Sequence, residues 1–510
     1  MERDRRTGEA LATSQLRDME HIHLSFPFGI DISERILARC RSLVSLATGE
    51  NQGFSGRPAN KDTHSAVADV SAAYTELHRM DTISWIQNHE LVRKRFAQLL
   101  SSSSRKTVYK MSETEMRRWR QNVVVFTRGF ATKLKRRRKF PGDFERKAQI
   151  CIDVIHTLIT SLRDNSEDAL YCDDYAFLVS LCQRATLLPR SFSCPDILQV
   201  GEDEPVDAGA SANIYRGSLG CAEVAVKSFR LYYRTMKQVK KRFIREALIL
   251  HVVRHPNILR FTSIVDEELK ICIITPWYGY GHIMKYIARV QDADLKELME
   301  QVADGLHFLC QYRIVHGDLK GTNVLIDNDG KAVIADLELS FIQDSTSSVT
   351  EQSHTAQDPF ALAILRAQCA EAIRSGRLSL SPRSISTLAA TVLSAASAAS
   401  STGGGTFRWM APERLVPSAY DLPTAKATMK SDVFSFGMLM LEVFTREPPW
   451  GTFRVECSIA LSVVTNIRPA RPSSIPDNLW EIVCDCWSHF PDRRPSIQEV
   501  YNCLAQHTVW

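Results

Sequence analysis

The chain has 510 residues, 44% of them hydrophobic and 24% charged, which is the ordinary balance of a folded globular protein with more than one domain. Its net charge of +5 is small for this length, so the charge balance gives no reason to expect nucleic acid as a partner. The thirteen cysteines are scattered without a C-x-x-C pair, which favours reduced thiols in a cytosolic protein over a disulfide framework.

The sequence pattern contains no membrane or secretion signal. No apolar run approaches the ~18 residues of a transmembrane helix. The first residues, MERDRRTGEA, are charged and no apolar core follows them, so we expect no signal peptide. We therefore predict a cytoplasmic protein without a membrane partner.

Residues 1–195 carry the periodicity of amphipathic helices. Apolar residues recur at steps of three and four in ISERILARCRSLVSLA, AYTELHRMDTISWIQNHELVRKRFAQLL and RKAQICIDVIHTLITSLRD. Polar segments such as TGENQGFSGRPANKDT separate these patterns. We predict a mainly α-helical N-terminal region that is regulatory or binds a protein partner, since nothing in it is typical of a catalytic site.

A basic run, KLKRRRK, extends from Lys133 to Lys139 within this region. We interpret it as the solvated face of a helix. The alternative is a nuclear localisation signal or a surface for an anionic partner, which would add the nucleus to the predicted cytoplasmic location.

A second domain is predicted at residues 196–508, where the pattern changes. Short runs rich in β-branched residues, such as EVAVKSF and LKICIIT, come first. Longer helical patterns such as DVFSFGMLMLEVF follow. Strands followed by helices indicate a two-lobed domain of the α+β class.

Seven short motifs follow one another in this domain: AGASANIYRG, VAVK, FIREALIL, HGDLKGTN, Asp336-Leu337-Glu338, GTFRWMAPE and SDVFSFG. Each is weak alone, but their order resembles a protein kinase domain, most closely the tyrosine-kinase-like Ser/Thr kinase family of the kind expanded in fungi. The resemblance covers residues from about 200 to 508 and does not extend to residues 1–190. It implies the bilobal kinase fold, with a β-rich N-terminal lobe and an α-helical C-terminal lobe.

The resemblance also implies catalytic roles, since phosphoryl transfer needs positioning and charge neutralisation. Asp318 would accept the proton of the substrate hydroxyl, and Lys320 would lie near the γ-phosphate of ATP. Lys227 would hold the α- and β-phosphates. Glu246 would pair with Lys227, because an isolated buried lysine is costly.

The cofactors implied are ATP and Mg²⁺. Asn323 and Asp336 offer the oxygen ligands that Mg²⁺ prefers. The resemblance places further residues in the phosphate-covering loop, around the adenine and at the hinge: Gly209, Ile214, Ala225, Lys227, Thr275, Trp277, Tyr278 and Leu325. Lysine at position 320 accompanies Ser/Thr substrates in the family, so we expect Ser/Thr hydroxyls of protein substrates as the acceptors.

Two supporting features are implied as well. Glu413 and Arg494 match residues that form a buried ion pair in the family. Asp432 matches the residue that anchors the catalytic loop from the helix beneath it.

Several positions depart from the family pattern. The pattern G-x-G-x-x-G falls on Asp207, Gly209 and Ala212, so only the middle glycine remains, and Asp207 would weaken ATP binding if it pointed inward. Glu338 replaces the glycine of the usual Asp-Phe-Gly turn and either adds a metal ligand or stiffens the turn. Gly317 replaces the arginine that usually receives an activation-loop phosphate, so activity should not depend on that phosphate.

The activation segment is unusually long because residues 341–402 form a stretch rich in Ser, Thr and Ala. We interpret it as a flexible insertion, or as residual non-coding sequence of a gene model, in which FALAILRAQCAEAI could form a helix. A functional insert that docks a partner or shields the cleft is the alternative.

Two functions follow from these observations. The first is an ATP-dependent protein serine/threonine kinase of intracellular signalling, whose activity the departures could reduce. It is favoured because the polar residues needed for transfer are all present. The second is a nucleotide-binding pseudokinase that acts as a signalling scaffold.

Overall fold

The structure is a computed structural model. It describes residues 82–91, 94, 113–134, 141–161, 169–193, 198–200, 204–209, 211–231, 236–267, 270–343, 406–420, 422, 424–451 and 456–506. The side chains of the basic run at 133–139 and most of the predicted insertion, residues 344–402, lie outside this description. Within the described part of the chain, no helix is both long enough and apolar enough to span a bilayer.

The chain divides into two compact units. The first combines Met1–Asn165 with Ser180–Ser191, and the second combines Ser166–Val179 with Phe192–Trp510. The helices of the first unit are α4 (Thr82–Gln87), α6 (Glu113–Leu134), α7 (Pro141–Ser161), the end of α8 (Ala169–Ala185) and most of the 3₁₀ turn η1 (Arg190–Phe192).

The first unit has an apolar core between its helices. Trp119 and Val123 on α6 are buried, as are Ile152 and Ile155 on α7. Spacings of three and four place each pair on one side of its helix, and α6 packs on α7 through these faces. Most of the described residues of this N-terminal region are therefore helical.

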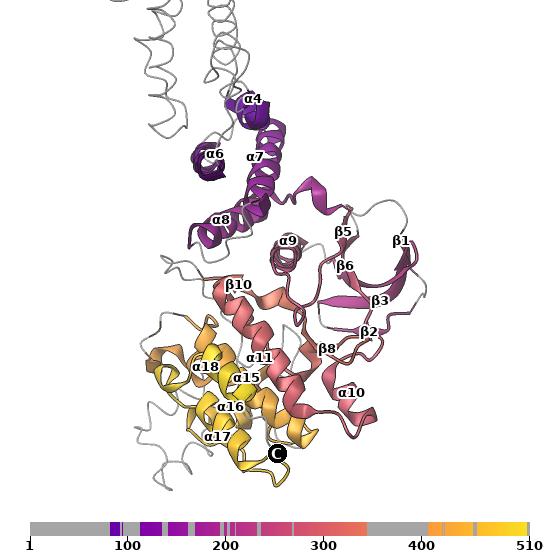
Figure 1. The fold of residues 1–510 in the computed structure, drawn as a ribbon, viewed down its shortest axis with the longest axis vertical. Helices are drawn as coiled ribbons and strands as arrows, with labels where there is room; N and C mark the ends of the chain where they lie inside the picture. Colours follow the sequence, from indigo (N-terminus) through magenta and orange to yellow (C-terminus); the bar gives the residue numbers. More distant parts are fainter. Residues whose placement is uncertain are drawn as a thin grey trace, which may run out of the picture. The chain divides into compact units, whose positions relative to one another are not determined.

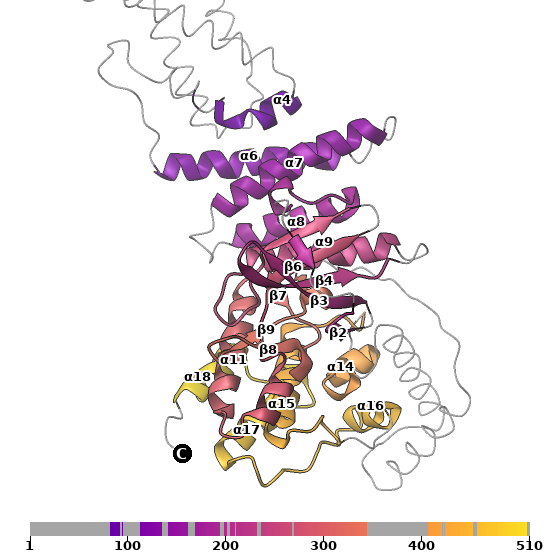
Figure 2. The same ribbon diagram turned by 90° about the vertical axis from the view of Figure 1, so that its right-hand side faces the viewer.

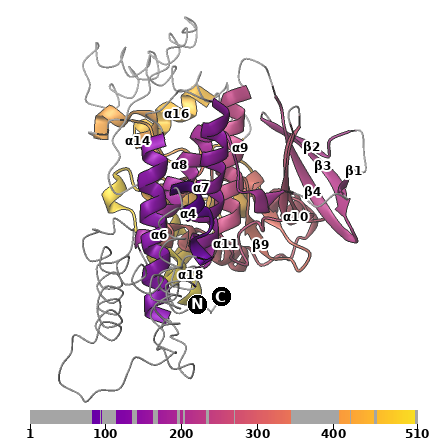
Figure 3. The ribbon, with the colours of Figure 1, turned by 90° about the horizontal axis from the view of Figure 1, so that it is seen from above.

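The second unit contains an antiparallel sheet of six strands in the order β1-β3-β4-β6-β5, with β2 paired to β3. The strands are β1 (Leu198–Val200), β2 (Asp207–Ala208), β3 (Ala212–Leu219), β4 (Ala222–Phe229), β5 (Ser263–Asp266) and β6 (Ile271–Pro276). Helix α9 (Met236–Val252) packs against β6, and Figure 3 shows this helix beside the sheet. Val224 and Val226 on β4 join Cys272 and Ile274 on β6 in the core of the sheet.

The rest of the second unit is mainly helical (Figures 1 and 2). Its helices are α10 (Ile283–Arg289), α11 (Leu295–Gln311), α14 (Pro412–Leu415), α15 (Met429–Thr445), α16 (Glu456–Val464), α17 (Asp477–Cys486) and α18 (Ile497–Gln506). Helix α15 is buried from Ser431 to Val443, so it forms the centre of this lobe. A strand-rich lobe followed by a helical one confirms the predicted bilobal α+β fold.

Short elements between α11 and α14 carry the motifs of the candidate site. They are β7 (Ile314–Val315), η2 (Gly321–Asn323), β8 (Val324–Ile326), β9 (Ala332–Ile334), η3 (Leu337–Leu339), β10 (Phe341–Ile342) and η4 (Thr406–Arg408). The turns η5 (Pro417–Tyr420) and η6 (Pro491–Arg493) complete the lobe. The strands form two antiparallel ribbons, β8 with β9 and β10 with β7.

The second unit also includes chain that precedes residue 196, where the sequence suggested the border. Tyr175, in the first half of α8, is 1% exposed and donates a hydrogen bond of 2.6 Å to the carbonyl oxygen of Leu248 on α9. Asp173 pairs with Arg313 at 3.1 Å. The first part of α8, residues 169–179, is thus packed within the second unit.

Candidate active site

A cleft of about 460 Å³ opens in the second unit, lined by its sheet, α9 and the short elements of the helical lobe. Every catalytic, nucleotide-binding and metal-ligating residue that the sequence predicted lines this one cleft: Gly209, Ile214, Ala225, Lys227, Glu246, Thr275, Trp277, Tyr278, Asp318, Lys320, Asn323, Leu325 and Asp336. Residues far apart in the sequence are therefore brought together as predicted, while their individual roles remain predictions.

Lys227 lies at the centre of a charged cluster. Strand periodicity places Ala225 and Lys227 on the opposite face of β4 from its core valines, so both reach the cleft. The Lys227 ammonium donates to Glu246 Oε1 at 2.9 Å and to Asp336 Oδ1 at 2.7 Å. Burial alone would lower the pKa of Lys227, but Asp336, Glu246 and Glu338 outweigh it and raise that pKa. The lysine therefore stays charged in the cleft.

The predicted catalytic loop, residues 316–323, is held in place by Asp432 of α15. The two carboxylate oxygens of Asp432 accept the backbone N–H groups of His316 at 2.7 Å and of Gly317 at 2.9 Å. His316 is fully buried, and its Nε2 lies 3.1 Å from the carbonyl oxygen of Ala335. The anchoring role expected for Asp432 is confirmed by these contacts.

Asp318 shares one carboxylate oxygen between two partners. Its Oδ2 accepts from Lys320 Nζ at 2.7 Å and from Asn323 Nδ2 at 3.1 Å. Its Oδ1 is buried and has no hydrogen-bond partner among the residues that the structure describes. A buried acceptor without a partner is costly, so this oxygen suits the hydroxyl proton of an incoming substrate.

The ribbon of β8 and β9 brings two candidate metal ligands together. Strand β8 begins directly after Asn323, and β9 ends two residues before Asp336. Their pairing places Asn323 beside Ala335, whose N–H donates to the Asn323 carbonyl oxygen at 2.8 Å. Lys227 holds the pKa of Asp336 below its ordinary value although burial opposes this. An ionised carboxylate and an amide oxygen are hard ligands, so this pair fits Mg²⁺.

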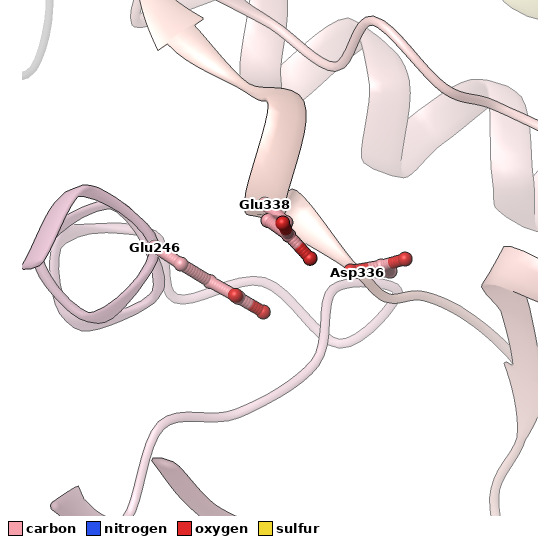
Figure 4. A group of neighbouring side chains, drawn as sticks. All are labelled: Glu246, Asp336 and Glu338. Atoms are coloured by element: carbon pink, nitrogen blue, oxygen red, sulfur yellow. The ribbon is translucent and has the colours of Figure 1, made fainter. Parts of the chain in front are cut away.

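A third carboxylate, Glu338, lies beside this pair, and Figure 4 shows it together with Asp336 and Glu246. One oxygen of each lies within 4.8 Å of the others. Both side-chain oxygens of Glu338 are engaged, however: Oε2 accepts from Ser211 at 2.5 Å, and Oε1 lies 3.3 Å from Arg242. Of the two alternatives that the sequence left open, this geometry favours a stiffened turn over an added metal ligand.

Sequence reasoning missed the partners of Glu338. Ser211 lies at the tip of the phosphate-covering loop, while Arg242 and Arg245 lie on α9. The only sequence signal was spacing on α9, since positions 242 and 245 lie on the same side of the helix as Glu246. Which residue this face would meet could not be read from the chain.

Asp207 lines the mouth of the cleft but is exposed. Its Oδ1 accepts the N–H of Ala208 at 2.8 Å, so the carboxylate bonds to its own loop. The residues of the predicted hinge, Trp277 and Tyr278, also line the cleft, and Thr275 just before them is buried and pairs in register with Ala225. The N–H of Trp277 donates to the Glu223 carbonyl oxygen at 3.2 Å.

Glu413 and Arg494 form the expected buried ion pair. The two guanidinium nitrogens of Arg494 donate to the two carboxylate oxygens of Glu413 at 2.6 and 2.7 Å. Both side chains are at most 1% exposed. This two-point contact ties the end of the activation segment to the helical lobe.

Comparison with known proteins agrees with this geometry. The sequence model of the family described as protein tyrosine and serine/threonine kinase matches residues 200–368 and 386–504, together more than half of the chain. The chain therefore belongs to this family, as the order of its motifs predicted. Membership implies ATP and a divalent cation as cofactors, and protein substrates.

Several plant and animal kinases are similar to this chain. Serine/threonine-protein kinase STY17 of Arabidopsis thaliana is 24% identical over 318 residues, which cover 61% of this chain and 45% of STY17. Serine/threonine/tyrosine-protein kinase HT1 of the same plant is 26% identical over 321 residues, covering 61% of this chain and 67% of HT1. Human mitogen-activated protein kinase kinase kinase 11 is 27% identical over 310 residues, covering 59% of this chain and 30% of the relative. The chain thus spans less than half the length of STY17 and of the human kinase.

Proposed function

We propose that this protein is an active serine/threonine kinase, which transfers the γ-phosphate of Mg-ATP to hydroxyl groups of signalling proteins. The observation that carries the proposal is the contact of Lys227 with both Glu246 and Asp336, in the cleft that also contains Asp318. A lysine held charged between two carboxylates from different lobes is the arrangement that phosphate positioning requires.

The chain's own residues would divide the work of transfer. Mg²⁺ held by Asn323 and Asp336 would supply charge neutralisation at the phosphates. Asp318 would orient the substrate hydroxyl and take its proton at Oδ1, the buried oxygen without a partner in the described part of the chain. Lys320, already 2.7 Å from Asp318, would carry positive charge next to the reacting group.

Serine and threonine are proposed as acceptors for two reasons. Lys320 occupies the position that accompanies Ser/Thr substrates in this family. STY17 is also named a serine/threonine-protein kinase, although HT1 is named for all three hydroxyl residues. The acceptor preference thus rests on Lys320 more than on the relatives.

A pseudokinase scaffold remains the second candidate. It is favoured by the two glycines missing at positions 207 and 212, since glycine lets backbone N–H groups approach a phosphate closely. On this alternative the cleft would bind nucleotide without transferring phosphate.

The test is an assay of the purified full chain with Asp318→Asn. The wild type should incorporate phosphate from Mg-ATP, and Asp318→Asn should lower the rate by about 100-fold or more because the general base is lost. Binding of a fluorescent ATP analogue should be retained by the variant. Asp329→Asn, which changes an exposed carboxylate in the turn between β8 and β9, serves as the matched control. Binding without incorporation, unchanged by Asp318→Asn, would favour the scaffold instead.

A further inference from the structure

We propose that Glu338 is a positioning residue that holds the phosphate-covering loop and α9 against the Asp336 turn. The proposal rests on the proposed kinase function, because it concerns the loop that would cover the phosphates of ATP. It assigns a purpose to the carboxylate that stands where the family usually has glycine.

The side chain of Glu338 contacts both the predicted phosphate-covering loop, through Ser211, and α9, through Arg242. Its Oε2 accepts from the Ser211 hydroxyl at 2.5 Å, and its Oε1 lies 3.3 Å from the Arg242 guanidinium. Glu338 is 8% exposed, so water competes little for these contacts. Hydrogen bonds to an ionised group in such surroundings are among the strongest in proteins.

The backbone of Glu338 adds a third contact. Its carbonyl oxygen accepts from Arg245 at 2.6 Å. Arg242, Arg245 and Glu246 lie three and four positions apart on α9, so one helix face holds the turn and also supplies the partner of Lys227. Movement of the turn would therefore disturb the Lys227–Glu246 pair as well.

Each carboxylate of this cluster has a cationic partner. Three carboxylates, Glu246, Asp336 and Glu338, lie close together. Lys227 contacts the first two, and Arg242 contacts the third. The Glu338 carboxylate repels those of Asp336 and Glu246. Arg242 on α9 offsets this repulsion, and glutamate is therefore tolerated at position 338.

The anchored loop is the same one that has lost two glycines. The N–H of Gly209 donates to the Ala212 carbonyl oxygen at 3.0 Å and closes the tip, and Ser211 lies within this closed turn. A loop that keeps only Gly209 of the three glycines gains a fixed position from the Ser211–Glu338 contact. We infer that this contact sets how closely the loop covers the nucleotide.

Kinetics of the full chain test the positioning role. Ser211→Ala should raise the KM for ATP about tenfold, as expected for a lost hydrogen bond to a charged group, and change kcat much less. Glu338→Gln should have the same effect, and the double variant should be no worse than either single one. Ser211→Thr keeps the hydroxyl and should therefore keep the wild-type KM for ATP. Unchanged KM values, or fully additive effects, would overturn the proposal.

Hydrogen–deuterium exchange of the nucleotide-free chain supplies a readout that needs no activity. Backbone amides of residues 206–214 should exchange about tenfold faster in Ser211→Ala and Glu338→Gln, because the loop loses its anchor. The control variants are Ser218→Ala and Glu223→Gln, a serine and a glutamate paired in register on β3 and β4 outside the cleft lining.

The exchange experiment separates failure of this proposal from failure of the kinase function. A chain that transfers no phosphate but shows faster loop exchange would keep the anchor and lose the proposed function. Loop exchange equal to wild type in both variants would overturn the anchor, whatever the activity.

Discussion

Glu442 shows how strongly one buried carboxylate can depend on its surroundings. It is 4% exposed, and its Oε2 accepts both the backbone N–H of Gly321 at 2.8 Å and the indole N–H of Trp409 at 2.9 Å. Burial raises the pKa of Glu442 to about 7, and these hydrogen bonds and the charge of Lys320 oppose the shift only partly. A residue outside the predicted site thus supports the catalytic loop and titrates near neutral pH.

The raised pKa predicts that this site loses stability as the pH rises. The folded chain holds the Glu442 proton more tightly than the unfolded chain, whose carboxyl has the ordinary value of 4.5. The contribution is therefore complete below about pH 4.5 and is lost as the pH rises through about 7, by up to ~3 kcal/mol. Calorimetry between about pH 5 and pH 8 should show a falling Tm whose slope Glu442→Gln reduces.

Glu447→Gln, at an exposed position just after α15, is the control for this experiment. It should leave the slope of Tm against pH unchanged. A slope that Glu442→Gln does not alter would contradict the assignment of the titration to this residue.

Among the elements, α8 and α9 carry more of the site's support than their sequences suggested. The buried Tyr175 hydroxyl of α8 donates to a carbonyl oxygen of α9, the helix that positions Glu246. The strands were easier to anticipate, because EVAVKSF and LKICIIT alternate or cluster apolar residues and correspond to β4 and β6. A contact between two helices distant in the sequence leaves no such local pattern.

Tyr175→Phe should lower the unfolding free energy of the second unit by ~1 kcal/mol, because it removes one buried hydrogen bond and leaves the ring in place. The second unit's transition in a calorimetric scan measures this loss. Tyr501→Phe on α18 is the matched control. Equal stability of Tyr175→Phe and wild type would show that the hydroxyl contributes nothing to the packing behind α9.

At the scale of the whole molecule, the order of the motifs sufficed to predict a bilobal kinase domain and the residues that line its cleft. The motifs are local and each combines a few chemically required residues, so they can be read without a structure. The links between Ser211, Arg242 and Glu338 could not, because they join three segments whose contacts depend on the folded arrangement. The contact between Tyr175 and Leu248 could not be read from the sequence for the same reason.

Regulation of the whole molecule should not depend on phosphorylation of its activation segment. Gly317 takes the place of the arginine that would receive the phosphate, and its φ of +82° is a conformation that residues with side chains rarely adopt. A Cβ there would lie 3.4 Å from the Leu339 carbonyl oxygen. Alanine replacement of the Ser and Thr residues between positions 344 and 405 should therefore leave specific activity largely unchanged in a phosphate-incorporation assay.

A loss of more than about tenfold on replacing only those residues would mean that another cation receives the phosphate. Asp318→Asn provides the inactive reference for the same assay. Treatment of the wild type with a phosphatase should give the same result as the alanine replacements, which separates loss of phosphate from loss of the side chains.

The contacts of Glu338 also have a pharmacological consequence. Leu337, directly before it, is fully buried. An inhibitor that enters by displacing Leu337 from its place must also pull Glu338 away from Ser211, Arg242 and Arg245. Compounds that occupy only the adenine region near Thr275 meet no such cost. We therefore expect inhibitors that contact only the predicted hinge to bind more tightly than inhibitors that require the turn at residues 336–338 to move outward.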